Sequence, residues 1–491
     1  MTAPGVYTTT SVLSGPAAST DAEAATYYVA GITERGEPSV STLVRSMNEF
    51  RETFGDPIPA GTLDEDLRTF FEEGGGRVAV TRAVGPAATT GDVTLGDSLR
   101  VEALSPGAWS SRVSVGVEAG SVAGAFTLAV YLDGAVVERW QDLADAAAAA
   151  LVLNGSAYVR GTDLGGTGDP APAAPVALAA GADDRAAVDG AALVAALPTG
   201  DTIKAPNGSV VPAGAGVVAV PGQSAATIGA ALLAYAKATS RIALLSMPAG
   251  TSATDARSAA RTLTATASQA GTAEFGGLFW PHLRVPVQGA NATRLVGPEG
   301  YVAAARARGI ISAGGPWRVG AGQLSAARYV AGVEAQADGR AELDALDDAR
   351  VSVIRPVVGV PQVYGHRSLS PDAANYRLLR ERDVVNAVAV ACSRAAEQFT
   401  FEVVDGYGRL QSRLKAALVG VVDPIAQAGG LYPSDGPGGG DPGYVVDTSA
   451  AVNTEAVLAR GEVRAFVGIR PSPTAELIQL TIAKAAPTTG L

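Results

Sequence analysis

Only two histidines occur in the 491 residues, so few places in the chain could support acid–base catalysis. His282 follows a Trp-Pro pair, and His366 lies in a Gly-His-Arg-Ser stretch. A serine hydrolase needs a histidine to take the proton of its nucleophile, and the α/β-hydrolase type also carries Gly-x-Ser-x-Gly. That motif is absent, and neither histidine has the sequence context of a catalytic one. We interpret both as structural or surface residues and predict no catalytic residue.

Motifs for nucleotides and metals are absent as well. A P-loop requires Gly-Lys-Ser/Thr, but none of the four lysines follows a glycine, and Gly214-Ala215-Gly216 lacks the rest of a dinucleotide-binding motif. Two histidines and the single cysteine, Cys392, are too few for a zinc centre. Cys392 lies on an apolar helical stripe, so we interpret it as a buried thiol. The sequence therefore predicts no cofactor, no metal and no enzymatic activity.

One polar feature is compatible with binding. Arg409, Arg413 and Lys415 lie off the apolar stripe of a predicted helix, and the two arginines are one helical turn apart. In a chain with a formal net charge of −11 they form a local basic face. This face is either a solvated helix surface or a docking surface for an acidic partner, and the residues alone leave both interpretations open.

The composition predicts an ordered protein with several cores. A chain of 491 residues is too long for one core, and 47% hydrophobic residues with a mean hydropathy of +0.20 indicate a core-rich protein. The negative charge argues against nucleic acid as the main partner. We expect no signal peptide and no membrane insertion, because the first residues lack an apolar segment and the longest uncharged run, 205–236, contains prolines and polar residues. Synthesis in the cytoplasm follows from this expectation.

Alternating helices and apolar strands predict α/β structure in two parts of the chain. In the first part, a strand at 24–32 precedes helices at 46–54 and 63–73 and a strand at 78–82. In the second part, helices alternate with fully apolar strands between residues 217 and 287. This alternation is typical of a mostly parallel sheet that is covered by helices.

The remaining parts have different patterns. Residues 91–180 contain short strand patterns and an Asp133-Gly134 pair that predicts a hairpin turn, so we expect a small β-rich domain there. Near the C-terminus, apolar stripes predict two long helices at 379–399 and 408–428, and a strand follows at 461–470. We expect the unfinished N-terminal α/β segment to pack with this last part.

Strand patterns at both ends of the chain are separated from the rest by proline or glycine. Residues 6–13 are rich in Thr, Val and Tyr and precede a Gly-Pro pair, and residues 474–482 alternate in polarity after two prolines. Such a strand is either an edge strand of its own domain or an arm that joins a neighbour's sheet. We predict arms, whose inter-subunit contacts would involve Val6, Tyr7, Glu476, Leu477, Ile478, Leu480 and Ile482.

Five short stretches resemble contractile tail sheath proteins, and they occur in order over nearly the whole chain. These stretches are Pro4-Gly5-Val6-Tyr7, Phe50 to Gly55, Ala103 to Trp109, Val220-Pro221-Gly222 and Pro471 to Leu480. The resemblance implies an α/β and α+β multidomain fold with terminal arms. Its parts would be an N-terminal arm (1–20), a discontinuous, tube-facing sheath domain (21–85 plus 360–472), an inserted β-rich domain (86–182), a subtilisin-like α/β domain (183–359) and a C-terminal arm (473–491).

The resemblance also implies a function. The chain would be a structural subunit that polymerises helically around an inner tube and contracts to drive this tube through a target envelope, in a phage tail or a phage-tail-like contractile injection system. Its partners would be further copies of the chain, the inner tube protein, and baseplate and terminal cap proteins, and the basic face would dock on the tube. Without a nucleotide site, the work would come from a metastable lattice that relaxes. The second candidate function is a surface or S-layer-like structural polymer, and the third is a subtilisin-like hydrolase.

Overall fold

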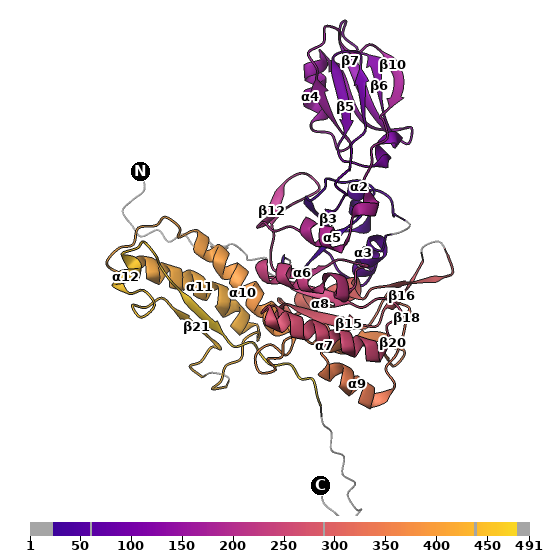
Figure 1. Cartoon of the computed structure of the whole chain (residues 1–491). Helices are drawn as coiled ribbons and strands as arrows, with labels where there is room; N and C mark the ends of the chain where they lie inside the picture. The colour runs from indigo at the N-terminus through magenta and orange to yellow at the C-terminus, as the bar shows by residue number, and fades with distance from the viewer. Residues whose placement is uncertain (1–22, 59–60, 288–289, 437–438, 479–491) are drawn as a thin grey trace, which may run out of the picture.

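The computed structural model describes residues 23–58, 61–287, 290–436 and 439–478, which form three joined units. An α/β body (23–85 and 183–378) occupies the middle of the molecule. A β-rich unit (86–182) projects from one end of this body, and a helical unit (379–472) lies at its side (Figure 1). The mixed α/β, multidomain fold with several sheets is thus the one that the sequence predicts.

Among the described residues, ten strands form the sheet of the α/β body, in the order β12-β11-β2-β3-β1-β13-β14-β15-β19-β20. These strands are β1 (Thr26–Gly31), β2 (Ser41–Val44), β3 (Val78–Arg82), β11 (Thr202–Lys204), β12 (Val210–Pro212), β13 (Gly216–Ala219), β14 (Ile242–Ser246), β15 (Gly276–Trp280), β19 (Val351–Val357) and β20 (Val360–Val363). All pairings from β3 to β19 are parallel, whereas β2, β12 and β20 each have an antiparallel neighbour. The sheet is therefore mostly parallel, as predicted.

The strands β1, β2 and β3 of the N-terminal part belong to this sheet. β1 pairs with β3 on one side and with β13 on the other, where Thr26 lies opposite Gly216. Every residue of β1 and β13 is buried, so neither strand could lie at a sheet edge without exposing apolar surface. The described residues between 23 and 85 therefore share this sheet with strands from the 202–363 region, whereas the sequence analysis expected 21–85 to form one domain with 360–472.

The central strands direct alternate side chains into two cores on opposite faces of the sheet. In β1, Tyr27 belongs to one core and Tyr28 to the other. The first core is covered by α2 (Met47–Phe54), α3 (Leu63–Glu72) and α8 (Glu299–Ala313), and the second by α5 (Gly190–Ala196), α6 (Ala225–Ala238), α7 (Ala253–Gln269) and α9 (Gly339–Asp348). Every residue of α8 from Glu299 to Ile310 is buried. Each polar side chain on this helix therefore needs a partner inside the protein.

The β-rich unit has a core of its own. One antiparallel sheet contains β4 (Asp92–Leu95), β5 (Leu99–Ala103) and β9 (Val159–Asp163), and another contains β6 (Val113–Ala119), β7 (Phe126–Leu132), β8 (Ala135–Leu143) and β10 (Ala173–Ala177). Helix α4 (Ala146–Leu153) packs against β9, and its Leu153 is fully buried. Asp133 and Gly134 have φ angles of 53° and 80°, which is the left-handed pair that an Asp-Gly hairpin turn requires.

The helical unit contains α10 (Leu379–Glu397) and α11 (Arg409–Gln427), which agree with the two predicted long helices to within two residues. Two short strands, β21 (Tyr444–Asp447) and β22 (Phe466–Ile469), and α12 (Glu455–Leu458) complete it. Helix α10 begins inside the α/β body, because Leu379 belongs to a core of the body whereas Val388 belongs to the core of the helical unit. One continuous helix thus connects the two units (Figure 1).

A fourth small sheet and four 3-10 helices complete the described structure. The sheet has the order β17 (Thr293–Val296), β16 (Leu283–Pro286), β18 (Gly332–Val333). The 3-10 helices are η1 (Ala108–Arg112), η2 (Arg185–Ala187), η3 (Ala273–Phe275) and η4 (Gly322–Ser325). No described helix combines the length and the apolar character that crossing a bilayer requires.

Candidate functional site

The two histidines lie in surroundings that do not suit acid–base catalysis. His366 is buried, its Nδ1 has no hydrogen-bond partner, and its ring lies edge-on to Phe279. Burial, together with the guanidinium groups of Arg306 and Arg380, lowers the pKa of His366 to about 3. Burial also lowers the pKa of His282. Within the described ranges, neither imidazole is hydrogen-bonded to a serine hydroxyl, so the pair that a serine hydrolase needs is not formed there.

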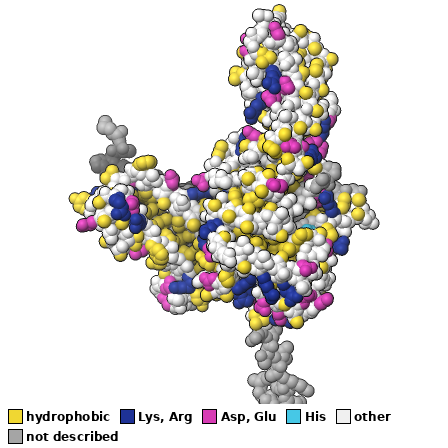
Figure 2. All heavy atoms as spheres, in the orientation of Figure 1, with side chains coloured by type: hydrophobic (Ala, Val, Ile, Leu, Met, Phe, Trp, Pro, Cys, Tyr) yellow, Lys and Arg dark blue, Asp and Glu magenta, His cyan; other side chains and the backbone are white. Residues whose placement is uncertain are grey.

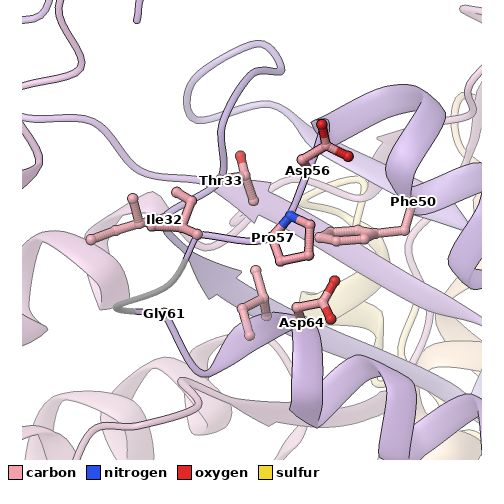
Figure 3. A pocket seen from close by; sticks show the side chains of 9 residues that line it. Ile32, Thr33, Phe50, Asp56, Pro57, Gly61 and Asp64 are labelled. Carbon is pink, nitrogen blue, oxygen red and sulfur yellow. The ribbon is translucent and has the colours of Figure 1, made fainter. Parts of the chain in front are cut away.

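Two pockets in the described residues are too small for a substrate. Figure 3 shows one, which is lined by Ile32, Thr33 and Phe50 together with Pro57 and Asp64. Its volume is about 10 Å³, and a second pocket, between α10 and the start of β1, measures about 30 Å³. A single water molecule needs space of this order. The same part of the chain contains no cluster of three His, Cys, Asp or Glu residues that could hold a metal ion.

The residues of the predicted basic face are exposed on α11, but acidic residues of the same chain lie beside two of them. The side chains of Arg409 and Arg413 are 76% and 59% exposed. Arg409 lies 3.8 Å from Asp405, and Arg413 lies 3.2 Å from Glu402. Lys415 is exposed as well. Exposed ion pairs of this kind are weak and exchange readily with solvent or with charges of a partner. The face is therefore mixed in charge rather than purely basic.

The loop between α10 and α11 exposes large apolar side chains that the sequence analysis missed. Phe401 is fully exposed, with a φ angle of 66°, and Val403 and Tyr407 are 81% and 84% exposed. Glu402, which lies between the first two, pairs with Arg413 and ties the loop to α11. A left-handed backbone is uncommon for an aromatic residue and is often found at functional positions. Periodicity could not identify these residues, because the loop follows no helical or strand repeat.

The C-terminal segment is attached to the body at one of the predicted contact residues. Glu476 accepts a hydrogen bond of 2.7 Å from Arg367, whose guanidinium also pairs with Asp347, and it lies 3.4 Å from Arg377. Beyond it, Leu477 and Ile478 are 67% and 77% exposed. Residues 474–478 join no strand of the described chain. The remaining predicted arm residues, Val6, Tyr7, Leu480 and Ile482, lie outside the described residues.

Two sheet edges remain open in the helical unit. β21 and β22 pair antiparallel with each other, from Tyr444 opposite Ile469 to Asp447 opposite Phe466, and with no other named strand of the described chain. A two-stranded sheet is marginally stable by itself and leaves unpaired N–H and C=O groups on both outer edges. On this sheet Val445 is 51% and Phe466 56% exposed. The unit thus offers backbone and apolar groups to additional strands. Figure 2 shows, in addition, basic and acidic side chains next to each other at the outer end of this unit.

The combination of a helix-covered sheet, an inserted β-rich unit and a helical unit with open edges defines a known class of fold. Comparison with solved structures identifies it as the fold of contractile tail sheath proteins, which confirms, for the fold, the resemblance seen in the sequence. No family model and no curated protein matches the sequence.

Three solved chains illustrate the similarity. The sheath tail protein of Listeria innocua aligns with a TM-score of 0.60 and 12% identity, over 92% of this chain and 98% of its own. A chain of the contracted anti-feeding prophage baseplate aligns at 0.58 and 20%, over 98% of both chains. A chain of the contracted PVC sheath, from an extracellular contractile injection system, aligns at 0.53 and 15%, over 99% of this chain and 98% of its own. At these identities the similarity establishes the fold.

Proposed function

We propose that the chain is the structural subunit of a contractile sheath, which polymerises helically around an inner tube and contracts to drive that tube through a target envelope. The observation that carries this proposal is the coverage of the alignments. They extend over at least nine-tenths of this chain and of each of the three solved chains, so the likeness includes the β-rich and helical units as well as the α/β sheet. Partial similarity to a widespread α/β sheet would not carry it.

The surfaces of the chain support a role in assembly rather than catalysis. The described pockets have the size of a water molecule, whereas the helical unit presents open strand edges and exposed apolar side chains. Such features fit partners that contribute strands and apolar contacts. No observation in the described structure favours the S-layer-like polymer or the subtilisin-like hydrolase over the sheath. The residues of 183–359 would correspond to the subtilisin-like domain of sheath proteins, used here as a scaffold.

The terminal segments would link the copies. In this proposal, the strand with Val6 and Tyr7 from one subunit and the strand with Leu480 and Ile482 from another pair with the β21–β22 sheet of a third. Each added main-chain hydrogen bond contributes roughly 0.5–1.5 kcal/mol, and the two open edges provide places for two strands. Subunits linked in this way remain connected while the contacts between their bodies rearrange. Copies related by such head-to-tail contacts form an open helix when the rotation between neighbours does not close into a ring.

The remaining partners follow from the same proposal. Arg409, Arg413 and Lys415 would dock on acidic groups of an inner tube protein, and the ends of the sheath would contact baseplate and terminal cap proteins. The assembled particle would be a phage tail or a phage-tail-like injection system that forms in the cytoplasm.

Electron microscopy of the purified full-length chain, alone and co-expressed with the tube protein encoded near it, tests the proposal. We expect helical tubes, with a wider and shorter form when the inner tube is absent. A chain that stays monomeric with and without the tube protein, or that forms flat two-dimensional arrays, would contradict the sheath function. The arrays would instead support the surface polymer.

A further inference from the structure

Two acidic side chains are completely buried where α3 packs against the first turn of α8. Asp66 on α3 and Glu299 on α8 are each 2% exposed, and both lie beneath the large sheet of the α/β body. Neither residue is part of the surfaces assigned to assembly. Buried carboxyl groups require hydrogen-bond donors, a cation or a proton, and these can be counted here.

Hydrogen bonds satisfy three of the four oxygens. Asp66 Oδ1 accepts a bond of 2.8 Å from the N–H of Gly300, and Oδ2 accepts one of 2.9 Å from the hydroxyl of Tyr27. Because Pro298 provides no side-chain cap for α8, Asp66 caps this helix from another part of the chain. Glu299 Oε1 is hydrogen-bonded to Ser246 Oγ. The other oxygen, Oε2, is buried without a partner.

The space around the carboxyl groups is kept free by two glycines. A Cβ atom on Gly300 would lie 2.8 Å from Asp66 Oδ1, and one on Gly297 would lie 2.0 Å from Glu299 Oε2. Both distances are shorter than normal contacts, so larger residues would displace the carboxyl groups. The space that each buried carboxyl group occupies therefore depends on a glycine in the local sequence.

No cation within the described residues compensates the pair. On α3, Arg68 pairs with Asp64 at 3.4 Å, and on α8, Arg308 lies 3.5 Å from Glu73. From the sheet, β1 contributes Tyr27 and β14 contributes Ser246, which carry no positive charge. Two neighbouring buried carboxylates whose hydrogen-bond donors are uncharged hydroxyl and amide groups cannot both ionise without a large electrostatic cost.

The pKa shifts of these buried groups agree with this geometry. Burial, and then the neighbouring Glu299, raises the pKa of Asp66 to about 8. Burial raises the pKa of Glu299 to about 7. Burial and both carboxyl groups also raise the pKa of Tyr27, which therefore stays protonated and donates to Asp66. At neutral pH the pair accordingly retains a proton that an exposed pair would have lost.

We propose that Asp66 and Glu299 form a proton-binding site that makes the packing of α3 on α8 depend on pH. A proton on the pair removes the charge from the oxygen that lacks a partner, and its loss places like charges across the contact between the two helices. The folded chain binds these protons more tightly than the unfolded chain does. The contribution of this pair to stability is therefore greatest at acid pH and declines as the pH rises from about 4, the ordinary carboxyl value, towards 8. This inference does not depend on the sheath function.

Urea unfolding of the full chain between pH 5 and 9, followed by tryptophan fluorescence, tests the proposal. For each additional proton that the folded chain holds, the unfolding equilibrium constant should rise by about tenfold per pH unit. Asp66→Asn with Glu299→Gln retains the hydrogen-bonding shape but removes the titration, so most of this pH dependence should disappear. Asp348→Asn, which changes an exposed carboxyl group, is the matched control and should leave the wild-type dependence intact.

Infrared spectroscopy of the wild-type chain provides a measurement that needs no variant. We expect the carbonyl band of a protonated carboxylic acid at pH 6, and its loss by pH 9. The absence of this band at pH 6 would overturn the proposal, as would an unchanged pH dependence in the double variant. Stabilisation of the wild type, but not of the double variant, by Ca²⁺ or Na⁺ at pH 7 would show that a cation, and not a proton, occupies the site.

Discussion

The α/β body and the helical unit differ in which side chains they bury: the body buries charged groups, whereas the helical unit exposes charged and large apolar groups. In the body, the fully buried carboxylate of Glu73 accepts hydrogen bonds from three consecutive backbone N–H groups, those of residues 328–330, and lies against Arg308. In the helical unit, the ion pairs of Arg409 and Arg413 are exposed, and Phe401 is fully exposed. The body thus pairs this buried charge internally. The helical unit leaves strand edges, charges and apolar groups available to other chains.

Removing the arms should give the largest effect, because it separates assembly from folding. We expect chains that lack residues 1–15 or 479–491 to remain monomeric in electron microscopy and light scattering, with melting temperatures close to that of the full chain. The deletion of 479–491 retains Glu476 and its pairs with Arg367 and Arg377. Normal sheath tubes from either variant would contradict the arm proposal. A collapse of the melting temperature would show that the deleted strand belongs to its own subunit.

The next largest effect should come from breaking the buried pair of Glu73 and Arg308 in the α/β body. Glu73→Ala removes the acceptor of three backbone N–H groups and leaves Arg308 buried without its carboxylate. Breaking a buried pair in this way costs about 3–5 kcal/mol of unfolding free energy. Glu402→Ala, which breaks the exposed pair with Arg413, is the matched control and should cost less than about 1 kcal/mol. Equal losses in denaturant unfolding of the two variants would invalidate the contrast between the two regions.

The sequence predicts much of the local structure because local structure depends on local periodicity. The long helices α10 and α11 and the strand β3 were predicted to within two residues, since each has an uninterrupted apolar repeat. The pairing of β1 with β13 could not be predicted in this way. β1 is apolar on both faces, which indicates a central strand but does not identify its neighbour, and β13 lies about 190 residues further along the chain.

The candidate surfaces were predictable only in part. The basic residues of α11 were found because they lie off the apolar stripe of this helix. Their acidic neighbours Asp405 and Glu402 lie in a loop, and loop geometry cannot be inferred from periodicity. The exposure of Phe401 is likewise decided by the path of the backbone and not by residue type. The pair of Asp66 and Glu299 joins segments more than 200 residues apart, and no pattern in one sequence connects them.

Changing the charge of the basic face should have an intermediate effect, limited to assembly. We expect Arg409, Arg413 and Lys415 changed together to Gln to leave the unfolding free energy within about 1 kcal/mol of wild type, because the pairs lost are exposed. The triple variant should form less sheath on tubes than the wild type at low salt. This difference should disappear at high salt, because salt screens the charges of the wild type. Changing all three to Glu should weaken sheath formation further. Normal assembly of both triple variants on tubes would show that the face is only solvated.

The smallest effect on stability should come from Phe401, the most exposed large apolar residue of the described chain. This residue tests the exposed region of the comparison, as Glu73 tests the buried one. Phe401→Asn removes a side chain with no burial to lose and introduces a residue that tolerates the observed φ of 66°. The unfolding free energy should therefore stay the same or rise by less than about 1 kcal/mol. Phe279→Ala, in the core beneath the sheet, should cost about 3–5 kcal/mol as the control.

Assembly distinguishes the meaning of the exposed ring. If Phe401→Asn folds normally but forms fewer or shorter sheath tubes, the loop contacts a partner chain, and the cost of exposing an aromatic ring in an unfavourable conformation is offset only in the assembled particle. If the tubes of Phe401→Asn are indistinguishable from those of the wild type, the loop does not contact a partner chain. Only the strand edges and the charged residues of the helical unit then remain as candidate contacts.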